Sequence, residues 1–179
     1  MRLVNSRLDR SIENMRSALI PMQYILFLVL AILVGCSSGG QNKKQQSDLQ
    51  QKLSAAIEKK GQSGEQVVIQ MKSLTDFEWD RFYVFDPYSS DDEVRDTLGF
   101  DTTIMAHSRI KHTDTHNLLV FVQNKQVEVF IDYPRSAGDF DKLKRRDGYN
   151  PAEANFEVKI EGVLLDGNPL LRLYQTVTP

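Results

Sequence analysis

The run Ile25 to Val34, ILFLVLAILV, constrains this chain more than any other stretch. It is a continuous block of apolar residues, and Gly35 and the only cysteine, Cys36, follow it. An apolar core of about 7–15 residues is typical of a secretory signal, whereas a helix that spans a membrane needs about 20. The run therefore predicts export of the residues that follow it. A membrane helix that is not cleaved is the alternative.

The segment 1–35 as a whole fits a signal peptide. Four arginines and two acidic residues precede the apolar run, and such a positive excess keeps this end of a chain in the cytoplasm. We expect 1–35 to be removed, so that the mature chain begins at Cys36. Met15 and Met22 are alternative starts to Met1.

The residues Leu33-Val34-Gly35-Cys36 resemble the lipobox of bacterial lipoproteins. The resemblance implies that the Cys36 thiol receives a diacylglycerol, that a peptidase cuts before it, and that acyl chains such as palmitate hold the mature protein. Two chains anchor a protein stably, because each buried methylene contributes ~0.8 kcal/mol and one chain binds only marginally. We therefore expect a protein anchored to a bacterial membrane through Cys36, with its domain on the extracytoplasmic side.

The segment 36–46 contains Ser, Gly, Gln and Lys but no aliphatic or aromatic residue. This composition predicts a disordered tether, in which Lys43 and Lys44 either keep the chain soluble or contact anionic headgroups. The segment 47–179 has the length of one domain. From Cys36 onward the chain carries 18 Lys and Arg against 22 Asp and Glu, and this balance gives no reason to expect a nucleic-acid partner.

The pattern of the domain predicts two short helices and five or six strands. Helices are expected over 48–60, from its apolar stripe, and over 91–98, between Ser90 and Gly99. The expected strands are 66–71, 81–85, 118–123, 126–133, 156–160 and 170–175. Asn124-Lys125 is expected to form a two-residue hairpin turn. We predict an α+β fold with a mostly antiparallel sheet.

The segment 77–88, FEWDRFYVFDPY, is the most aromatic part of the chain. It resembles a segment of small uncharacterised bacterial lipoproteins with the pattern F-x-W-D-x-F/V-Y-V-F-x-P-Y, a resemblance that implies no activity. The matching residues are Phe77, Trp79, Asp80, Phe82, Tyr83, Val84, Phe85, Pro87 and Tyr88. We expect these aromatic residues to form the core, because each buries about 150–250 Å². A peptide or glycan platform is the alternative.

The histidines His107, His112 and His116 lie close together in the sequence, with Asp114 between the last two. Imidazole and carboxylate groups bind divalent metals, so a metal-dependent hydrolase that uses His112, Asp114 and His116 is the alternative function. No zinc-protease motif, serine elbow or phosphate-binding glycine loop supports an enzyme. We expect no catalytic, cofactor or metal residues.

The basic residues Lys142, Lys144, Arg145 and Arg146 form a cluster. An anionic lipid or polymer is one partner for such a cluster, and a solvated turn balanced by nearby aspartates is the simpler interpretation. The sequence as a whole predicts a lipid-anchored binding or envelope accessory domain with an envelope protein as a possible partner. Cys36 is the single site residue that it predicts.

Overall fold

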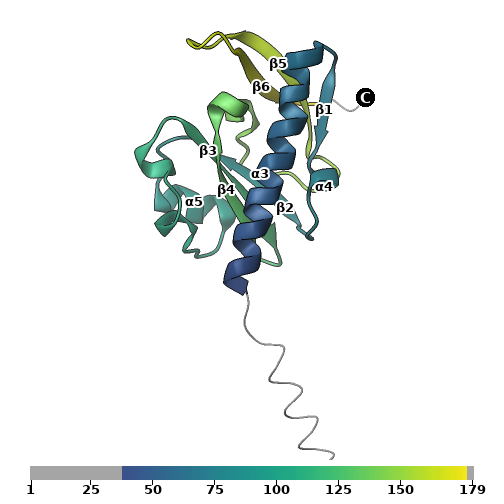
Figure 1. Ribbon diagram of the computed structural model, residues 1–179. Coiled ribbons are helices and arrows are strands. Elements are labelled where there is room, and N and C mark those ends of the chain that lie inside the picture. Colours follow the sequence, from purple (N-terminus) through teal and green to yellow (C-terminus); the bar gives the residue numbers. More distant parts are fainter. Residues whose placement is uncertain (1–37, 177–179) are drawn as a thin grey trace, which may run out of the picture. The chain divides into compact units, whose positions relative to one another are not determined.

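The computed structural model describes residues 38–176, and the side-chain environment of residues 43–176. The described α-helices are α3 (Ser38–Ser63), α4 (Met71–Leu74) and α5 (Asp91–Leu98) (Figure 1). The strands are β1 (Val67–Gln70), β2 (Arg81–Phe85), β3 (His116–Gln123), β4 (Gln126–Pro134), β5 (Asn155–Val163) and β6 (Pro169–Gln175). Short 3₁₀ helices are η1 (Ile104–Ala106), η2 (Ile110–His112), η3 (Arg135–Ala137) and η4 (Asp141–Leu143).

The six described strands form two antiparallel sheets of three strands each, in the orders β1-β5-β6 and β2-β3-β4. This confirms the predicted α+β class and the number of strands. Apolar residues of both sheets contribute to one large core. The rings of Phe82 in β2 and Phe156 in β5 lie 5.8 Å apart between their centroids and join the sheets there.

The sheet β2-β3-β4 is buried on both faces. Phe82, Phe121 and Ile131 belong to the large core, which also contains residues of α3, β5 and β6. Phe85 and Val120 belong to a second core under α5, η1 and η2. Successive side chains of a strand point to opposite faces, so the alternation in β2 supplies both cores. The prediction of a β2 strand buried on both faces is confirmed.

Helix α3 is longer than predicted in both directions. It begins at Ser38, so the disordered tether predicted over 36–46 is corrected from Ser38 onward. The lysines and glutamines of 43–46 are good helix formers, and the buried stripe of Leu49, Leu53 and Ile57 holds the helix to the core. The helix also continues through Gly61 and ends before Gly64, whose φ of 66° suits glycine.

The β3–β4 hairpin has the predicted turn and a different register. Asn124 and Lys125 adopt positive φ angles of 50° and 59°, the conformation of a two-residue type I′ turn. Val122 pairs with Val127 as predicted, but an irregularity after this pair places Val120 opposite Phe130 instead of Val129. A β-bulge inserts one extra residue in one strand, and it shifts every later pair in the hairpin.

Helix α5 agrees with its local sequence signals. The Ser90 hydroxyl accepts a hydrogen bond from the Glu93 backbone N–H at 3.1 Å, and Gly99 ends the helix with φ 76°. Val94 and Leu98 are buried in the second core. The predicted bounds of 91–98 are confirmed.

Candidate functional site

The hairpin formed by β5 and β6 ends in an exposed apolar surface. The exposed fractions are 47% for Ile160, 71% for Val163 and 110% for Leu165. These residues stand out in a domain whose other large side chains are mostly buried. We call Ile160, Val163 and Leu165 the hairpin patch.

Strand register shows that this surface continues the core. Ile160 lies opposite Leu171, and Val163 lies opposite Pro169. Directly opposed residues on neighbouring strands point to the same face. One step further in, Val158 and Leu173 are opposed and fully buried. The face that packs against α3 in the domain therefore runs out into solvent at the end of the hairpin.

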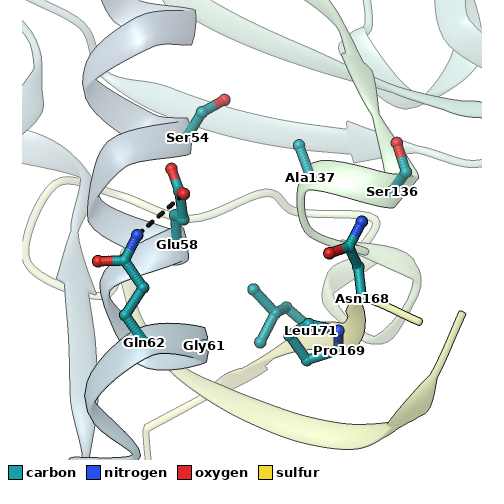
Figure 2. A pocket seen from close by; sticks show the side chains of 9 residues that line it. All are labelled: Ser54, Glu58, Gly61, Gln62, Ser136, Ala137, Asn168, Pro169 and Leu171. Atoms are coloured by element: carbon teal, nitrogen blue, oxygen red, sulfur yellow. Dashed lines mark hydrogen bonds between the residues drawn. The ribbon is translucent and has the colours of Figure 1, made fainter. Parts of the chain in front are cut away.

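A pocket of about 360 Å³ lies beside this face, between α3 and β6. Figure 2 shows α3 on one side, with Ser54, Glu58 and Gln62, and η3 on the other, with Ser136 and Ala137. The residues that line the pocket are Ser54, Glu58, Gly61, Gln62, Ser136, Ala137, Asn168, Pro169 and Leu171. Since Leu171 and Pro169 line the pocket and lie opposite Ile160 and Val163 of the hairpin patch, the patch and the pocket are treated as one candidate site.

Two glycines allow the walls of this pocket to approach closely. A Cβ atom on Gly61 would lie 3.2 Å from Pro169 Cγ, and one on Gly138 would lie 2.8 Å from Ile57 Cδ1. Gly138 also has φ 151°, a conformation that side chains other than glycine rarely adopt. Glycine at these positions lets α3 pack tightly against β6 and η3.

The Tyr133 hydroxyl fixes the base of the pocket. Its oxygen lies 3.0 Å from Ser54 Oγ, and it donates to the Ala137 carbonyl at 3.3 Å. Burial of the hydroxyl raises the pKa of Tyr133 to about 12. The β4 strand, α3 and η3 are thereby linked through one neutral polar group.

A buried aspartate attaches the η3 segment to β6. The Asp139 backbone N–H donates to Leu171 at 2.8 Å, and its carbonyl accepts from Leu173 at 2.9 Å. Its carboxylate lies 2.7 Å from Arg135 Nη2 and 3.5 Å from Arg172 Nη2. The hydrogen bond to Asp139 raises the pKa of Arg135. Asp139 therefore attaches the pocket wall to β6 through two backbone hydrogen bonds and through the ion pairs of its carboxylate.

The pocket offers binding chemistry and little catalytic chemistry. Glu58 supplies one carboxylate, which accepts a hydrogen bond from Gln62 Nε2 at 3.0 Å (Figure 2). The other polar groups are serine hydroxyls and the amides of Gln62 and Asn168, around an apolar floor of Ala137, Pro169 and Leu171. Such a surface suits an apolar side chain flanked by hydrogen-bonding groups.

The predicted aromatic segment lies in the core, with one exception. Phe77, Trp79, Phe82, Tyr83 and Phe85 are buried, whereas Tyr88 is 63% exposed. Trp79 Nε1 donates to Thr75 Oγ1 at 3.0 Å. This confirms a core function for the segment and corrects the alternative of an aromatic platform.

The structure does not assemble the predicted histidine site. His107 is exposed directly after η1, His112 is exposed at the end of η2, and His116 begins β3, where its Nδ1 lies 2.8 Å from Thr115 Oγ1. Asp114 uses its backbone carbonyl to accept from Arg135 Nη1 at 3.1 Å. Within the described residues, no group of three His, Cys, Asp or Glu side chains is arranged to hold a metal.

The basic cluster is largely paired. Lys144 Nζ lies 3.1 Å from the Asp86 carboxylate and 2.9 Å from that of Glu93. The hydrogen bond from Lys144 lowers the pKa of Glu93. Arg145 lies over the Tyr149 ring, 5.2 Å from its centroid. These contacts support the interpretation of a balanced surface, with one partner in α5 and another, Asp86, directly after β2.

Cys36 and the signal segment 1–35 lie outside the described residues. Over 38–176, none of the helices combines the length and the apolar character that a membrane crossing requires.

The sequence analysis did not identify the hairpin patch, although Val163, Leu164 and Leu165 form an apolar run directly before the turn at Asp166 and Gly167. That run is the signal by which it can be found.

No model of a known protein family, no curated protein and no solved structure matches this chain.

Proposed function

We propose that this chain is a bacterial lipoprotein whose folded domain binds a partner protein in the cell envelope. The hairpin patch carries the binding part of the proposal. Contiguous exposed apolar surface that continues a hydrophobic core is characteristic of protein interaction sites. The adjacent pocket gives this surface the concave shape and hydrogen-bonding rim that partner side chains need.

The free edge of β5 near the end of the hairpin favours a protein as the partner. Within the described residues, β1 pairs with β5 only from Asn155 to Val158, so the rest of β5 has an unpaired edge on that side. Unpaired backbone groups on a strand edge pair readily with an added strand. Apolar side chains and free backbone groups thus occur together at this end of the hairpin.

The lipobox supports the lipid anchor. Leu33-Val34-Gly35-Cys36 follows an apolar run of signal length, and the thiol is the only one in the chain. A lipid-anchored domain is confined to the membrane surface, where its effective concentration for envelope partners rises.

Metabolic labelling with a palmitate analogue tests the anchor. The full-length chain, expressed in a lipoprotein-processing bacterium, should incorporate the label and fractionate with membranes. Cys36→Ser should abolish incorporation and the shift in mass that signal cleavage causes. Equal labelling of both chains, or an unmodified Cys36 thiol in the membrane fraction, would overturn the anchor.

Site-specific photo-crosslinking in cells tests the partner site. A benzophenone amino acid at Leu165 should give a discrete crosslinked product that is absent with the same probe at Lys125, an exposed residue of the β3–β4 turn. Val163→Asp should remove the product, because a carboxylate in an apolar contact is costly to desolvate. A product that survives Val163→Asp, or that also forms at Lys125, would contradict specific binding by the hairpin patch.

A further inference from the structure

Helix α3 carries a positive charge in a domain that is otherwise acidic. It contains five lysines against two acidic residues, whereas the residues after it carry 13 Lys and Arg against 20 Asp and Glu. Lys43, Lys44, Lys52 and Lys59 are exposed. The charge of the domain is therefore polarised, with its basic side on this one helix.

The lysines of α3 are not neutralised by carboxylates of the domain. Among the described residues, every lysine in a salt bridge lies outside α3. Lys52 Nζ donates to the Leu74 carbonyl at 3.5 Å, and Lys60 Nζ donates to the carbonyls of Gly64 and Glu65 at 3.1 and 2.6 Å. Their charges remain available to an external anion.

Three of these lysines share one side of the helix. At about 100° per residue, Lys44, Lys52 and Lys59 lie within about 80° of one another, with Ala55 and the half-buried Asp48 between them, so this side of the helix keeps a net positive charge. Ala55 is exposed, and the buried stripe of Leu49, Leu53 and Ile57 faces the core. We call Lys44, Lys52 and Lys59 the lysine face. Figure 1 shows α3 along the outside of the domain.

The chain connects this face directly to the predicted lipid anchor. Helix α3 begins at Ser38, two residues after Cys36. Two residues span at most about 7 Å, so lipids on Cys36 would hold the first turn of the helix at the membrane surface. An anionic surface attracts each nearby lysine enough to change affinity about fivefold.

We propose that the lysine face of α3 docks on an anionic lipid surface, so that the helix lies along the membrane that holds the anchor. This proposal rests on the proposed lipid anchor for its location. Charge complementarity favours anionic lipid as the binding partner, because the proposed anchor would hold these lysines close to the membrane surface. The acidic remainder of the domain is then turned towards solvent.

Fluorescence quenching of the lipidated full chain tests the proposal. Because lipidation consumes the only native thiol, Ala55→Cys introduces a single site for a fluorescent label. The labelled lipoprotein is reconstituted in phosphatidylcholine vesicles with or without phosphatidylglycerol, both containing a quencher on the lipid headgroups. We expect at least about threefold stronger quenching with phosphatidylglycerol, and loss of the difference near 1 M salt, where the Debye length falls to about 3 Å.

Charge-matched variants separate the lysine face from net charge. Lys44→Gln, Lys52→Gln and Lys59→Gln together should reduce quenching to the level of neutral vesicles. Lys125→Gln, Lys142→Gln and Arg146→Gln together remove the same charge elsewhere and should leave quenching unchanged. Equal effects of the two sets, or quenching that does not depend on phosphatidylglycerol, would overturn the proposal. The lysine face would then contact an acidic protein or remain in solvent.

The two proposals fail in different ways. If Cys36 is not lipidated, mass spectrometry of the purified chain shows a free thiol, and the label attaches at two positions. If Cys36 is lipidated and the Ala55→Cys label is not quenched on anionic vesicles, the anchor stands and the docking of α3 is wrong.

Discussion

The carboxylate of Asp80 accepts a hydrogen bond from the backbone N–H of Asn124 at 2.6 Å. Asp80 directly precedes β2, and Asn124 begins the turn between β3 and β4. The Asp80 N–H also donates to the Val122 carbonyl at 2.7 Å. The aspartate that follows Trp79 therefore stabilises a turn in a strand pair much later in the chain, and this gives the W-D pair a structural function.

Asp80→Ala should lower the free energy of unfolding by about 1–2 kcal/mol, because it leaves the Asn124 N–H without its charged acceptor. Urea unfolding followed by tryptophan fluorescence measures the change. Asp76→Ala is the matched control, since Asp76 is exposed and precedes the same strand. An equal loss in both variants would show that the hydrogen bond to Asn124 is not its cause.

Lys125→Gly should raise the free energy of unfolding by about 0.5 kcal/mol. Lys125 has φ 59°, a conformation that costs about 1 kcal/mol for a residue with a Cβ and little for glycine. The gain is partly offset by the greater freedom of glycine in the unfolded chain. Gln126→Gly, one residue later in β4, should instead destabilise the domain. The same sign of change at both positions would contradict the turn conformation.

Tyr133→Phe should change how stability depends on alkaline pH. The folded pKa of about 12 exceeds the ordinary value of 10.0, so the unfolded chain releases this proton first. The contribution of the neutral hydroxyl is fully present below pH 10 and is lost as pH rises towards 12, in total of the order of 2–3 kcal/mol.

Denaturant unfolding of the two chains between pH 8 and 12 measures this effect. Tyr133→Phe should be less stable at pH 8, because Ser54 and Ala137 lose a partner, and its stability should fall less steeply above pH 10. A variant that follows the parent slope at every pH would show that Tyr133 does not contribute to it.

Asp139→Ala should lower the free energy of unfolding by about 1–3 kcal/mol, because it leaves the partly exposed Arg135 without the carboxylate that it contacts at 2.7 Å. The change also leaves the Asp141 backbone N–H without the Asp139 carboxylate that accepts its hydrogen bond at 3.1 Å. Differential scanning calorimetry measures the change. Asp147→Ala, at an exposed aspartate in the same segment, should have little effect. A small effect of both changes would contradict the structural importance of the buried pair.

The agreement between sequence and structure is best where signals are local. Helix α5 has its cap, its acidic first turn and its terminal glycine within ten residues, and its bounds are as predicted. The side chains of β2 point alternately into the two cores, as its continuous run of apolar residues predicts. The prediction of 48–60 for α3 was too short at both ends, since Ser47 and Gly61, which flank it, lie inside the helix.

The candidate site depended on tertiary structure. The alternation of Phe156, Val158 and Ile160 predicts one apolar face for β5, but it does not distinguish the two buried residues from Ile160, which is 47% exposed. Burial depends on where α3 ends relative to the hairpin, and Gly61 and Pro169 set that position through a close contact between distant segments.

By itself, the sequence determined the α+β class, the strand segments, helix α5 and the turn at Asn124, because short-range hydrogen bonds and backbone preferences govern these features. It also carries the lipobox prediction at Cys36. The tertiary structure alone decided that the strands divide into two sheets, that Val120 faces Phe130, and that the hairpin patch is left uncovered. These outcomes depend on contacts between residues far apart in the chain, and a local sequence pattern does not specify which distant residues come into contact.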